Sequence, residues 1–340
     1  MKISFLVTYY QQERYVQESM DSILALEKPE EWEILIGDDG STDGTVEKAQ
    51  SYVDRDPEHI RLFVMDREPM RKYNPVERAS ANRLNLLRNA AGDCYCLMDG
   101  DDFYSETDFV PEAISVLESH PEVNVVGFGT WMYWEGEAER RKTGGRRKPV
   151  PVHRRHYLRW QYTHAGACVF RKDDTAENLA RLGQLGSFDD NDIVLNALSR
   201  GKMIRIYRPV YAYRQVAGSV YNAMNPAERA ALNVIGLGFD LLIMGPKWER
   251  DVTARCATAV WMAWFLRKRL RKELEPTRFQ TYLEGCRRAG FLRGEKLLCY
   301  PEQDRKEQRE IRKWVFRAGL ESPPRVFYAW FQIHCRRRKA

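Results

Sequence analysis

Short apolar runs alternate with amphipathic segments through the first 133 residues, and this alternation restricts the chain to one class of fold. The apolar runs predict strands at 3–7, 32–37, 60–65, 94–98 and 123–133. The amphipathic segments predict helices at 13–26, 43–53, 76–90 and 108–119. Alternation at this spacing produces βαβ units with right-handed crossovers, so the sequence predicts an α/β fold with a mainly parallel sheet. Ligands of such sheets bind beyond the carboxyl ends of the strands.

Three carboxylates follow the apolar run at 94–98 directly. They are Asp99, Asp101 and Asp102, and Gly100 between them keeps the turn tight. Like charges at the end of a strand repel one another unless a cation neutralises them. Mg²⁺ and Mn²⁺ prefer oxygen ligands and commonly lie between one or two carboxylates and the phosphates of a substrate. The cluster therefore predicts a Mn²⁺ or Mg²⁺ ion and a phosphorylated substrate.

Two further acidic clusters occur in the chain. The segment "DDGSTDGT" (38–45) follows the second predicted strand, and "FDDNDI" (188–193) opens a predicted helix. In the first cluster, Asp38 or Asp39 could accept a hydrogen bond from the imide N–H of a nucleotide base. Taken alone, the first cluster is equally explained by a capped turn, and the second by an acid-rich helix start. All three acidic clusters in this order, including residues 99–102, indicate a functional site more specifically than any one cluster alone.

These segments resemble the motifs of glycosyltransferase family 2, a family of inverting enzymes with the GT-A fold. The resemblance covers about residues 1–222 and rests on "FLVTYYQQERYVQESMDSIL", "EILIGDDGSTDGT", "AGDCYCLMDGDDFY", "FDDNDIVLNAL" and "YRQVAGSV". It implies a Rossmann-like, mixed but mainly parallel sheet flanked by helices. Beyond residue 226, outside the resemblance, helical patterns at about 227–244, 252–273, 276–289, 303–318 and 323–338 predict a helical C-terminal region.

The resemblance also implies roles in binding the nucleotide-sugar donor. Thr8 and Tyr10 would flank the base, and Asp39 would pair with uracil. Asp99 and Asp101 would be the two acids of the DxD motif, with Asp101 as the direct ligand of the metal ion.

The remaining implied roles concern the sugar, the diphosphate and the chemistry. Asp102 would lie beside the sugar, and Arg214, Ser219 and His164 would contact the diphosphate. Asp190 would be the general base that takes the proton of the acceptor hydroxyl as it attacks the anomeric carbon. For His164, a simple packing role is an equally good interpretation.

Some residues depart from the family pattern. Tyr10 stands where the family often has Asn, and Asp189-Asp190 replaces the usual Glu-Asp, which leaves open which of the two acids is the base. The sequence lacks a Gln-x-x-Arg-Trp segment, and no run of apolar residues is long enough to span a membrane. These two features favour addition of a single sugar over processive polymer synthesis.

The predicted function is thus metal-dependent, inverting transfer of one sugar from a UDP-sugar to an acceptor hydroxyl. The acceptor would be a glycan or a lipid-linked molecule of cell-envelope or surface polysaccharide synthesis. One alternative is a nucleotidyltransferase, although the usual glycine-rich phosphate loop is missing from the N-terminal segment. The other is a protein that binds a nucleotide-sugar without turning it over.

The charge of the chain divides it into two predicted domains, 1–225 and 226–340. Residues 226–340 contain 25 Lys and Arg against 13 Asp and Glu, a net of +12, whereas residues 1–225 have a net of −6. Segments 256–272 and 325–340 each join Trp-rich apolar residues to a basic run, a composition typical of helices that lie on anionic membranes. The alternative is an ordinary basic helical subdomain, and no nucleic-acid motif accompanies the charge.

The predicted location is the cytoplasm, at the inner face of the cell membrane. Met1 and Lys2 lead directly into an apolar strand, so we expect no signal peptide. The seven cysteines form no CxxC pair and are expected to be reduced thiols. Residues 136–160, which are basic and contain Gly and Pro, predict a surface loop.

Overall fold

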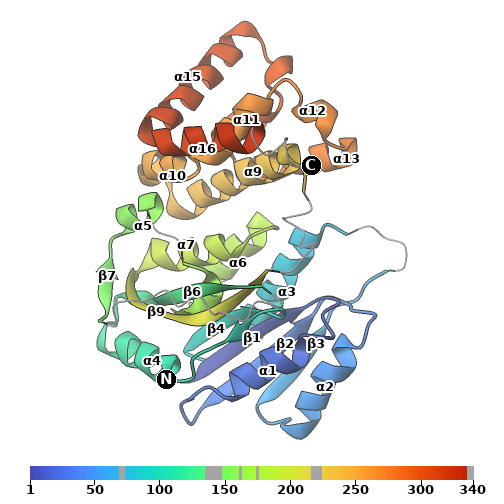
Figure 1. The fold of residues 1–340 in the computed structure, drawn as a ribbon, viewed down its shortest axis with the longest axis vertical. Coiled ribbons are helices and arrows are strands. Elements are labelled where there is room, and N and C mark those ends of the chain that lie inside the picture. The colour runs from blue at the N-terminus through green and yellow to red at the C-terminus, as the bar shows by residue number, and fades with distance from the viewer. Residues whose placement is uncertain (69–72, 135–147, 161–162, 174–175, 216–223, 335–340) are drawn as a thin grey trace. The chain divides into compact units, whose positions relative to one another are not determined.

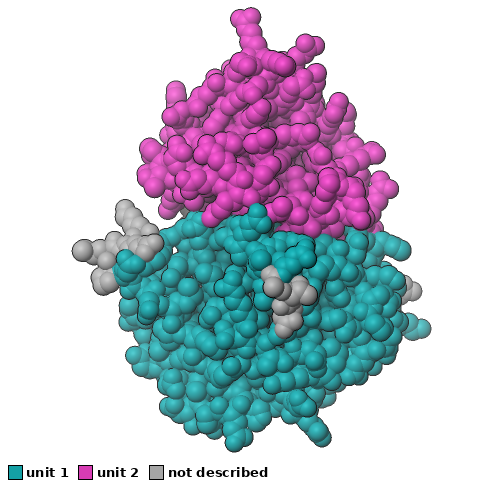
Figure 2. Space-filling view, turned by 180° about the vertical axis from the view of Figure 1, so that it is seen from behind, with its two compact units in different colours: residues 1–154, 162–217 teal, residues 155–161, 218–340 magenta. Residues whose placement is uncertain are grey.

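The computed structural model describes residues 1–68, 73–134, 148–160, 163–173, 176–215 and 224–334. The chain divides into two compact units (Figures 1 and 2). The first consists of residues 1–154 and 162–217, and the second of residues 155–161 and 218–340.

The first unit contains a nine-stranded sheet with the order β3-β2-β1-β4-β8-β6-β9-β5, and β7 pairs with β9. The strands are β1 (Ile3–Tyr9), β2 (Trp32–Asp38), β3 (Ile60–Val64), β4 (Cys94–Asp99), β5 (Phe103–Tyr104), β6 (Val123–Trp134), β7 (Val150–Val152), β8 (Cys168–Arg171) and β9 (Lys202–Gln215). β1 to β4 are parallel neighbours, β8 is antiparallel to both β4 and β6, and β6 is parallel to β9. The predicted mixed, mainly parallel α/β sheet is therefore confirmed.

Helices cover both faces of this sheet (Figure 1). They are α1 (Val16–Leu24), α2 (Thr45–Arg55), α3 (Pro75–Asn89), α4 (Phe109–Ser119), α6 (Ala176–Leu185) and α7 (Asp190–Arg200). The alternation of side chains along β1 sends Ile3, Phe5 and Val7 into one core with α1, α2 and α4. Thr8 consequently points to the opposite face, where α3 packs on β1 and β2. The same alternation along β4 places Asp99 on the α3 side.

Four strands were not predicted from the sequence. β5, β7 and β8 are two to four residues long, too short to produce a periodic pattern. β9 is long, but Pro209 and several charged residues interrupt the apolar pattern of its sequence. The predicted loop at 136–160 is wrong in its last part, because β7 and helix α5 (Arg154–Trp160) lie there. Residues 135–147 lie outside the described residues.

The second unit is helical, as predicted. Besides α5 it contains α9 (Pro226–Met244), α10 (Glu249–Arg255), α11 (Ala257–Leu266), α12 (Leu270–Glu273), α13 (Pro276–Arg288), α14 (Leu292–Leu298), α15 (Arg305–Glu321) and α16 (Pro323–His334). The single helix expected at 252–273 is wrong, because the chain forms the separate helices α10, α11 and α12 there. Within the described residues, no helix has the length and apolar composition needed to cross a bilayer.

Helix α11 forms the centre of the second unit. It is apolar around its whole circumference and buries Val260, Trp261, Ala263 and Trp264. Trp261 and Trp264 were predicted to contact a membrane, and their burial corrects that prediction, because neither ring is free to insert into lipid. Among the side chains of α16 up to residue 330, the large apolar ones that remain exposed are Phe327, Tyr328 and Trp330.

Candidate active site

A polar cluster lies where β1 and β4 end side by side. Thr8 and Asp99 are partners in the register of the two strands, and the Thr8 hydroxyl donates to Asp99 Oδ1 over 3.3 Å. A small pocket at this point is lined by Thr8, Arg83, Leu97, Met98, Asp99, His164, Ala165, Gly166, Asp190 and Tyr211. The lining thus contains Asp99, His164 and Asp190, which the sequence separates by as many as 91 residues.

Arg83 lies between the two carboxylates of this pocket and was not predicted from the sequence. Its Nη2 atom is 2.7 Å from Asp99 Oδ1 and 3.3 Å from Asp190 Oδ1. A signal for Arg83 does exist in the sequence of α3. Ser80, Leu84 and Leu87 form the buried stripe of this helix, and Arg83 falls on the same stripe. A charged residue on a buried stripe indicates a partner inside the protein.

Asp190 and its neighbour Asp189 have different surroundings at the start of α7. The Asp189 carboxylate caps the helix by accepting hydrogen bonds from the backbone N–H groups of Asn191 and Asp192. Asp190 lines the pocket instead. Burial alone would raise the pKa of Asp190, but Arg83 and His164 outweigh it and hold that pKa well below its usual range. Asp190 is therefore a carboxylate at neutral pH.

His164 is buried beside Asp190, with its Nε2 atom 3.1 Å from Asp190 Oδ2. The backbone N–H of Gly166 donates to His164 Nδ1 over 3.1 Å, so the ring proton lies on Nε2 and is donated to Asp190. Burial opposes a second proton on the ring, whereas Asp190 favours it and raises the pKa of His164 to about 9. A proton on Nδ1 would have to face the Gly166 N–H, so we expect the neutral Nε2–H tautomer to persist while that hydrogen bond is made.

Asp102 has structural contacts that the sequence did not indicate. It is 1% exposed, and its carboxylate accepts hydrogen bonds from the Tyr211 hydroxyl and from the backbone N–H of Arg214, both over 2.7 Å. Burial, together with the charges of Asp101 and Asp99, raises the pKa of Asp102 well above its usual value. These contacts fasten β9 to the turn that follows β4.

Asp101 is the next carboxylate of the turn that follows β4. Burial, followed by the neighbouring charge of Asp99, raises its pKa to about 6, although Arg214 and Gln12 lower it in part. A divalent cation at Asp99 and Asp101 would relieve this repulsion, so the residues present fit the expected metal ion. Among the described residues, no group of three or more His, Cys, Asp or Glu side chains is arranged to hold a metal. Such an ion would need further ligands, and the phosphates of a substrate can supply them.

Arg214 lies beside this turn. Its Nε atom donates to the backbone oxygen of Asp101 over 2.6 Å, and its guanidinium also forms an ion pair with Glu18. The rings of Tyr15, Phe103 and Tyr133 surround the guanidinium, with centroids 4.8 to 5.4 Å from it. Ser219, the other residue predicted to contact a diphosphate from this segment, lies outside the described residues.

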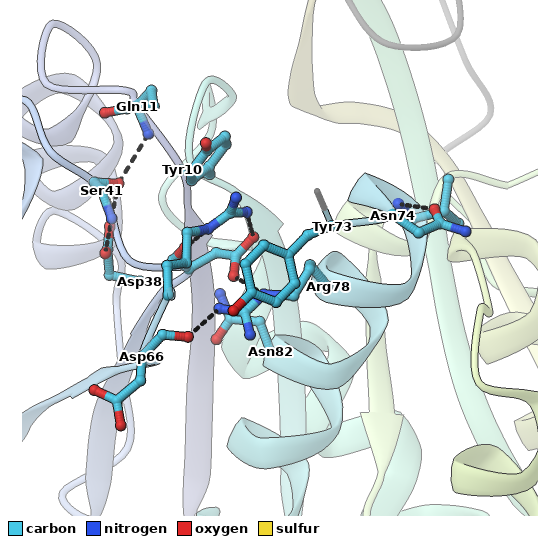
Figure 3. A network of polar contacts seen from close by, with 12 residues as sticks. Tyr10, Gln11, Asp38, Ser41, Asp66, Tyr73, Asn74, Arg78 and Asn82 are labelled. Atoms are coloured by element: carbon cyan, nitrogen blue, oxygen red, sulfur yellow. Dashed lines mark hydrogen bonds and ion pairs between the residues drawn. The ribbon is translucent and has the colours of Figure 1, made fainter. Parts of the chain in front are cut away.

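The predicted nucleotide site lies after β1 and β2 (Figure 3). Asp38 accepts hydrogen bonds from the Ser41 backbone N–H and hydroxyl, so it holds the turn. Asp39 is only 5% exposed, and its carboxylate lies between two arginines that were not predicted from the sequence, Arg67 and Arg78.

Two aromatic rings complete this site. The Arg67 guanidinium lies 4.0 Å from the ring centroid of Tyr10, and that of Arg78 lies 4.8 Å from the ring centroid of Tyr73. Figure 3 shows Tyr10, Tyr73 and Arg78 gathered in one place, with Ser41 and Gln11 beside them. Flat cations layered with aromatic rings form a surface suited to a planar base.

The fold and the site together define a class: an α/β protein with a polar pocket at the carboxyl edge of a mainly parallel sheet, where such folds bind their ligands. The profile of the family described as "Glycosyl transferase family 2" matches residues 4–175, which is half of the chain. The chain therefore belongs to glycosyltransferase family 2.

Individual relatives and solved structures agree with this family. EpsE of Bacillus subtilis is 34% identical over 134 residues, which are 39% of this chain and 45% of EpsE. The dodecaprenyl-phosphate galacturonate synthase of Rhizobium johnstonii is 27% identical over 130 residues, or 38% of this chain and 36% of the synthase. The matches thus span less than half the length of these two relatives. Residues 1–349 of S. aureus TarS, solved with UDP, share the fold with a TM-score of 0.57 at 14% identity, covering 97% of this chain and 90% of that one.

Proposed function

We propose that this protein transfers a single sugar from a UDP-sugar to an acceptor hydroxyl, with inversion and with a divalent metal ion. The observation that carries the proposal is the pocket that joins the acid at the end of β4, Asp99, to an ionised carboxylate at the start of α7, Asp190. Asp99 suits a metal ion that binds the donor phosphates, and Asp190 suits the hydroxyl of the acceptor. No observation favours the nucleotidyltransferase alternative.

Asp190 acts as the general base in this proposal. It is already deprotonated, and the Nε2–H of His164 holds its Oδ2 atom. The other oxygen, Oδ1, lies 3.3 Å from Arg83 Nη2 and has a second lone pair that can accept the proton of the acceptor hydroxyl. The hydroxyl attacks the anomeric carbon as the bond to the diphosphate breaks. Configuration therefore inverts in one displacement, without a covalent enzyme intermediate.

Asp99 and Asp101 would hold the Mn²⁺ or Mg²⁺ ion. When bound, the ion supplies positive charge to the departing diphosphate. Arg214 lies against the same turn, and its guanidinium would be a second positive group that stabilises the departing diphosphate. Asp102 fixes the shape of this turn through its hydrogen bonds to Tyr211 and Arg214, and the turn would place it beside the sugar.

Asp39 would recognise the base of the donor. A carboxylate oxygen accepts hydrogen bonds, so it suits the imide N–H of uracil, and Thr8 and Tyr10 would flank the base. UDP-GlcNAc is a suitable first donor to test, because S. aureus TarS, which has the same fold, is described in complex with it.

We further propose that the acceptor is a glycan or a lipid-linked molecule presented at the inner face of the cell membrane. The name of the Rhizobium relative includes dodecaprenyl phosphate, a lipid carrier, which supports an acceptor of this type. The net charge of +12 on residues 226–340 and the exposed rings of α16 support contact with an anionic surface.

The decisive experiment measures release of the nucleotide product from a panel of UDP-, GDP- and dTDP-sugars with Mn²⁺ and with EDTA. We expect release from a UDP-sugar with Mn²⁺, and its loss with EDTA. Absence of release from every nucleotide-sugar, despite tight donor binding, would favour a binding protein. Formation of a nucleotide-sugar from UTP and a sugar 1-phosphate would favour a nucleotidyltransferase.

A further inference from the structure

Arg83 forms an internal bridge between the donor side and the acceptor side of the site. One nitrogen atom, Nη2, lies within ion-pair distance of Asp99 and of Asp190. The guanidinium therefore lies against the same carboxylate oxygen, Asp99 Oδ1, that also accepts the hydrogen bond from Thr8. A metal ion that uses Asp99 must approach a carboxylate already neutralised by an arginine.

The position of Arg83 is fixed by its helix. The flanking residues Leu84, Leu86 and Leu87 are buried, and α3 packs on β1, β2 and α6. The Arg83 side chain is only 13% exposed. Because the guanidinium has little freedom and is largely shielded from water, its attraction for both carboxylates is stronger than that of a surface arginine.

We propose that Arg83 is a positioning residue that holds Asp190 in place and competes with the metal ion for Asp99. This inference rests on the proposed function. Without a nucleotide, Arg83 neutralises Asp99, and the protein binds metal weakly. The phosphates of the donor add the ligands and the negative charge that shift Asp99 toward the metal, so metal and donor bind together, while Arg83 stays with Asp190.

The test is a titration with Mn²⁺, with and without UDP, by calorimetry or by electron paramagnetic resonance. Arg83→Met removes the competing charge but keeps a long apolar side chain. We expect Arg83→Met to bind Mn²⁺ about 10-fold or more tightly than the unchanged protein in the absence of UDP. Arg83→Lys keeps a charge that reaches one carboxylate only, so its affinity should fall between the two.

The matched control is Arg88→Met, on the same helix. Arg88 is exposed, so its charge is screened by water, and its loss should leave the Mn²⁺ affinity unchanged. Transfer should fall in Arg83→Met even though its metal affinity rises. A merely structural defect would instead weaken both.

The outcomes separate this inference from the proposed function. If the unchanged protein binds Mn²⁺ with UDP, and neither Arg83 variant binds Mn²⁺ more tightly without UDP, the competition is wrong and the function stands. If no form binds Mn²⁺ even with UDP, the metal dependence is wrong and the inference falls with it. Should Arg83→Met fail to fold, as judged by circular dichroism, the Lys variant decides: tighter binding supports the competition and equal binding overturns it.

Discussion

The two adjacent acids at the start of α7 show how neighbouring residues of one type are given different tasks. The Oδ1 atom of Asp189 accepts hydrogen bonds from two backbone N–H groups, whereas Asp190 lies beside Arg83 and His164. The sequence left open which of them is the base, because two adjacent Asp residues look alike in sequence and the direction of each side chain cannot be inferred from it. The helix start decides that direction.

We predict that Asp190→Asn lowers sugar transfer by roughly 10²–10⁴-fold, because the amide keeps the shape but cannot accept the proton. Binding of UDP, measured by calorimetry, should change little. The comparison is Asp189→Ala, which should lower the free energy of unfolding by about 1 kcal/mol through loss of the helix cap. If Asp189→Ala abolishes transfer in a folded protein and Asp190→Asn does not, the base has been misassigned.

The pH dependence of metal binding is a second prediction at this scale. Because the pKa of Asp101 is raised to about 6, protons compete with the metal ion below that pH. The affinity for Mn²⁺ in the presence of UDP should therefore be constant above pH 7 and decline as the pH falls through 6. Titrations from pH 5 to 8 measure this, and Asp101→Asn should remove the dependence together with most of the affinity. A flat profile for the unchanged protein would remove Asp101 from the site.

At the scale of elements, the sequence predicted the part of the fold in which strands and helices alternate. The parallel strands β1, β2 and β4 appear as apolar runs because they are buried on both faces. β9 was missed although it supplies Tyr211 and Arg214 to the site, because Pro209 and several charged residues break its apolar pattern. Its bonds to Asp102 also span more than 100 positions of the sequence. Likewise, the roles of Arg67, Arg78 and Arg83 depend on ion pairs with carboxylates of other elements. Local patterns predict where a strand ends, but not which cation approaches it.

The link between β9 and the turn after β4 can be tested directly. Tyr211→Phe leaves one oxygen of the buried Asp102 without its hydroxyl donor, so we expect the free energy of unfolding to fall by about 1–3 kcal/mol. Denaturation with urea measures the change. Tyr95→Phe on β4, which also removes one hydroxyl from a tyrosine of the same sheet, serves as the comparison and should have a smaller effect. Equal losses in the two variants would mean that the hydrogen bond to Asp102 has no special weight.

At the scale of the whole molecule, the charge asymmetry and the exposed rings of the second unit lead to a prediction about membranes. Phe327 is 68% exposed and Tyr328 is 53% exposed, both on α16. Basic residues near an anionic surface contribute about 1 kcal/mol each, and salt screens this attraction. The protein should therefore sediment with vesicles that contain anionic lipid at low salt, and less at high salt.

Substitutions separate the rings from the charge. Phe327→Ser combined with Tyr328→Ser should weaken sedimentation with anionic vesicles and leave hydrolysis of the donor unchanged. Leu292→Ser is the matched control, because Leu292 is an equally exposed apolar residue, at 63%, on α14 of the same unit. If the unchanged protein ignores anionic vesicles at low salt, the acceptor is a soluble molecule and the basic charge merely faces water.

The short helix α5 has a consequence for synthesis on the ribosome. Residues 155–160 of this helix belong to the second unit, where Arg159 forms ion pairs with Asp251 and Glu321, yet they are translated before the last part of the first unit. At about 5–20 residues per second, α5 waits on the order of ten seconds for the last of these partners to emerge. During that interval the nascent chain carries an arginine-rich segment whose acidic partners do not yet exist. The connectivity therefore sets an order of folding. The sheet of the first unit can form before the second unit is complete, and α5 packs only after the C-terminal helices have been synthesised.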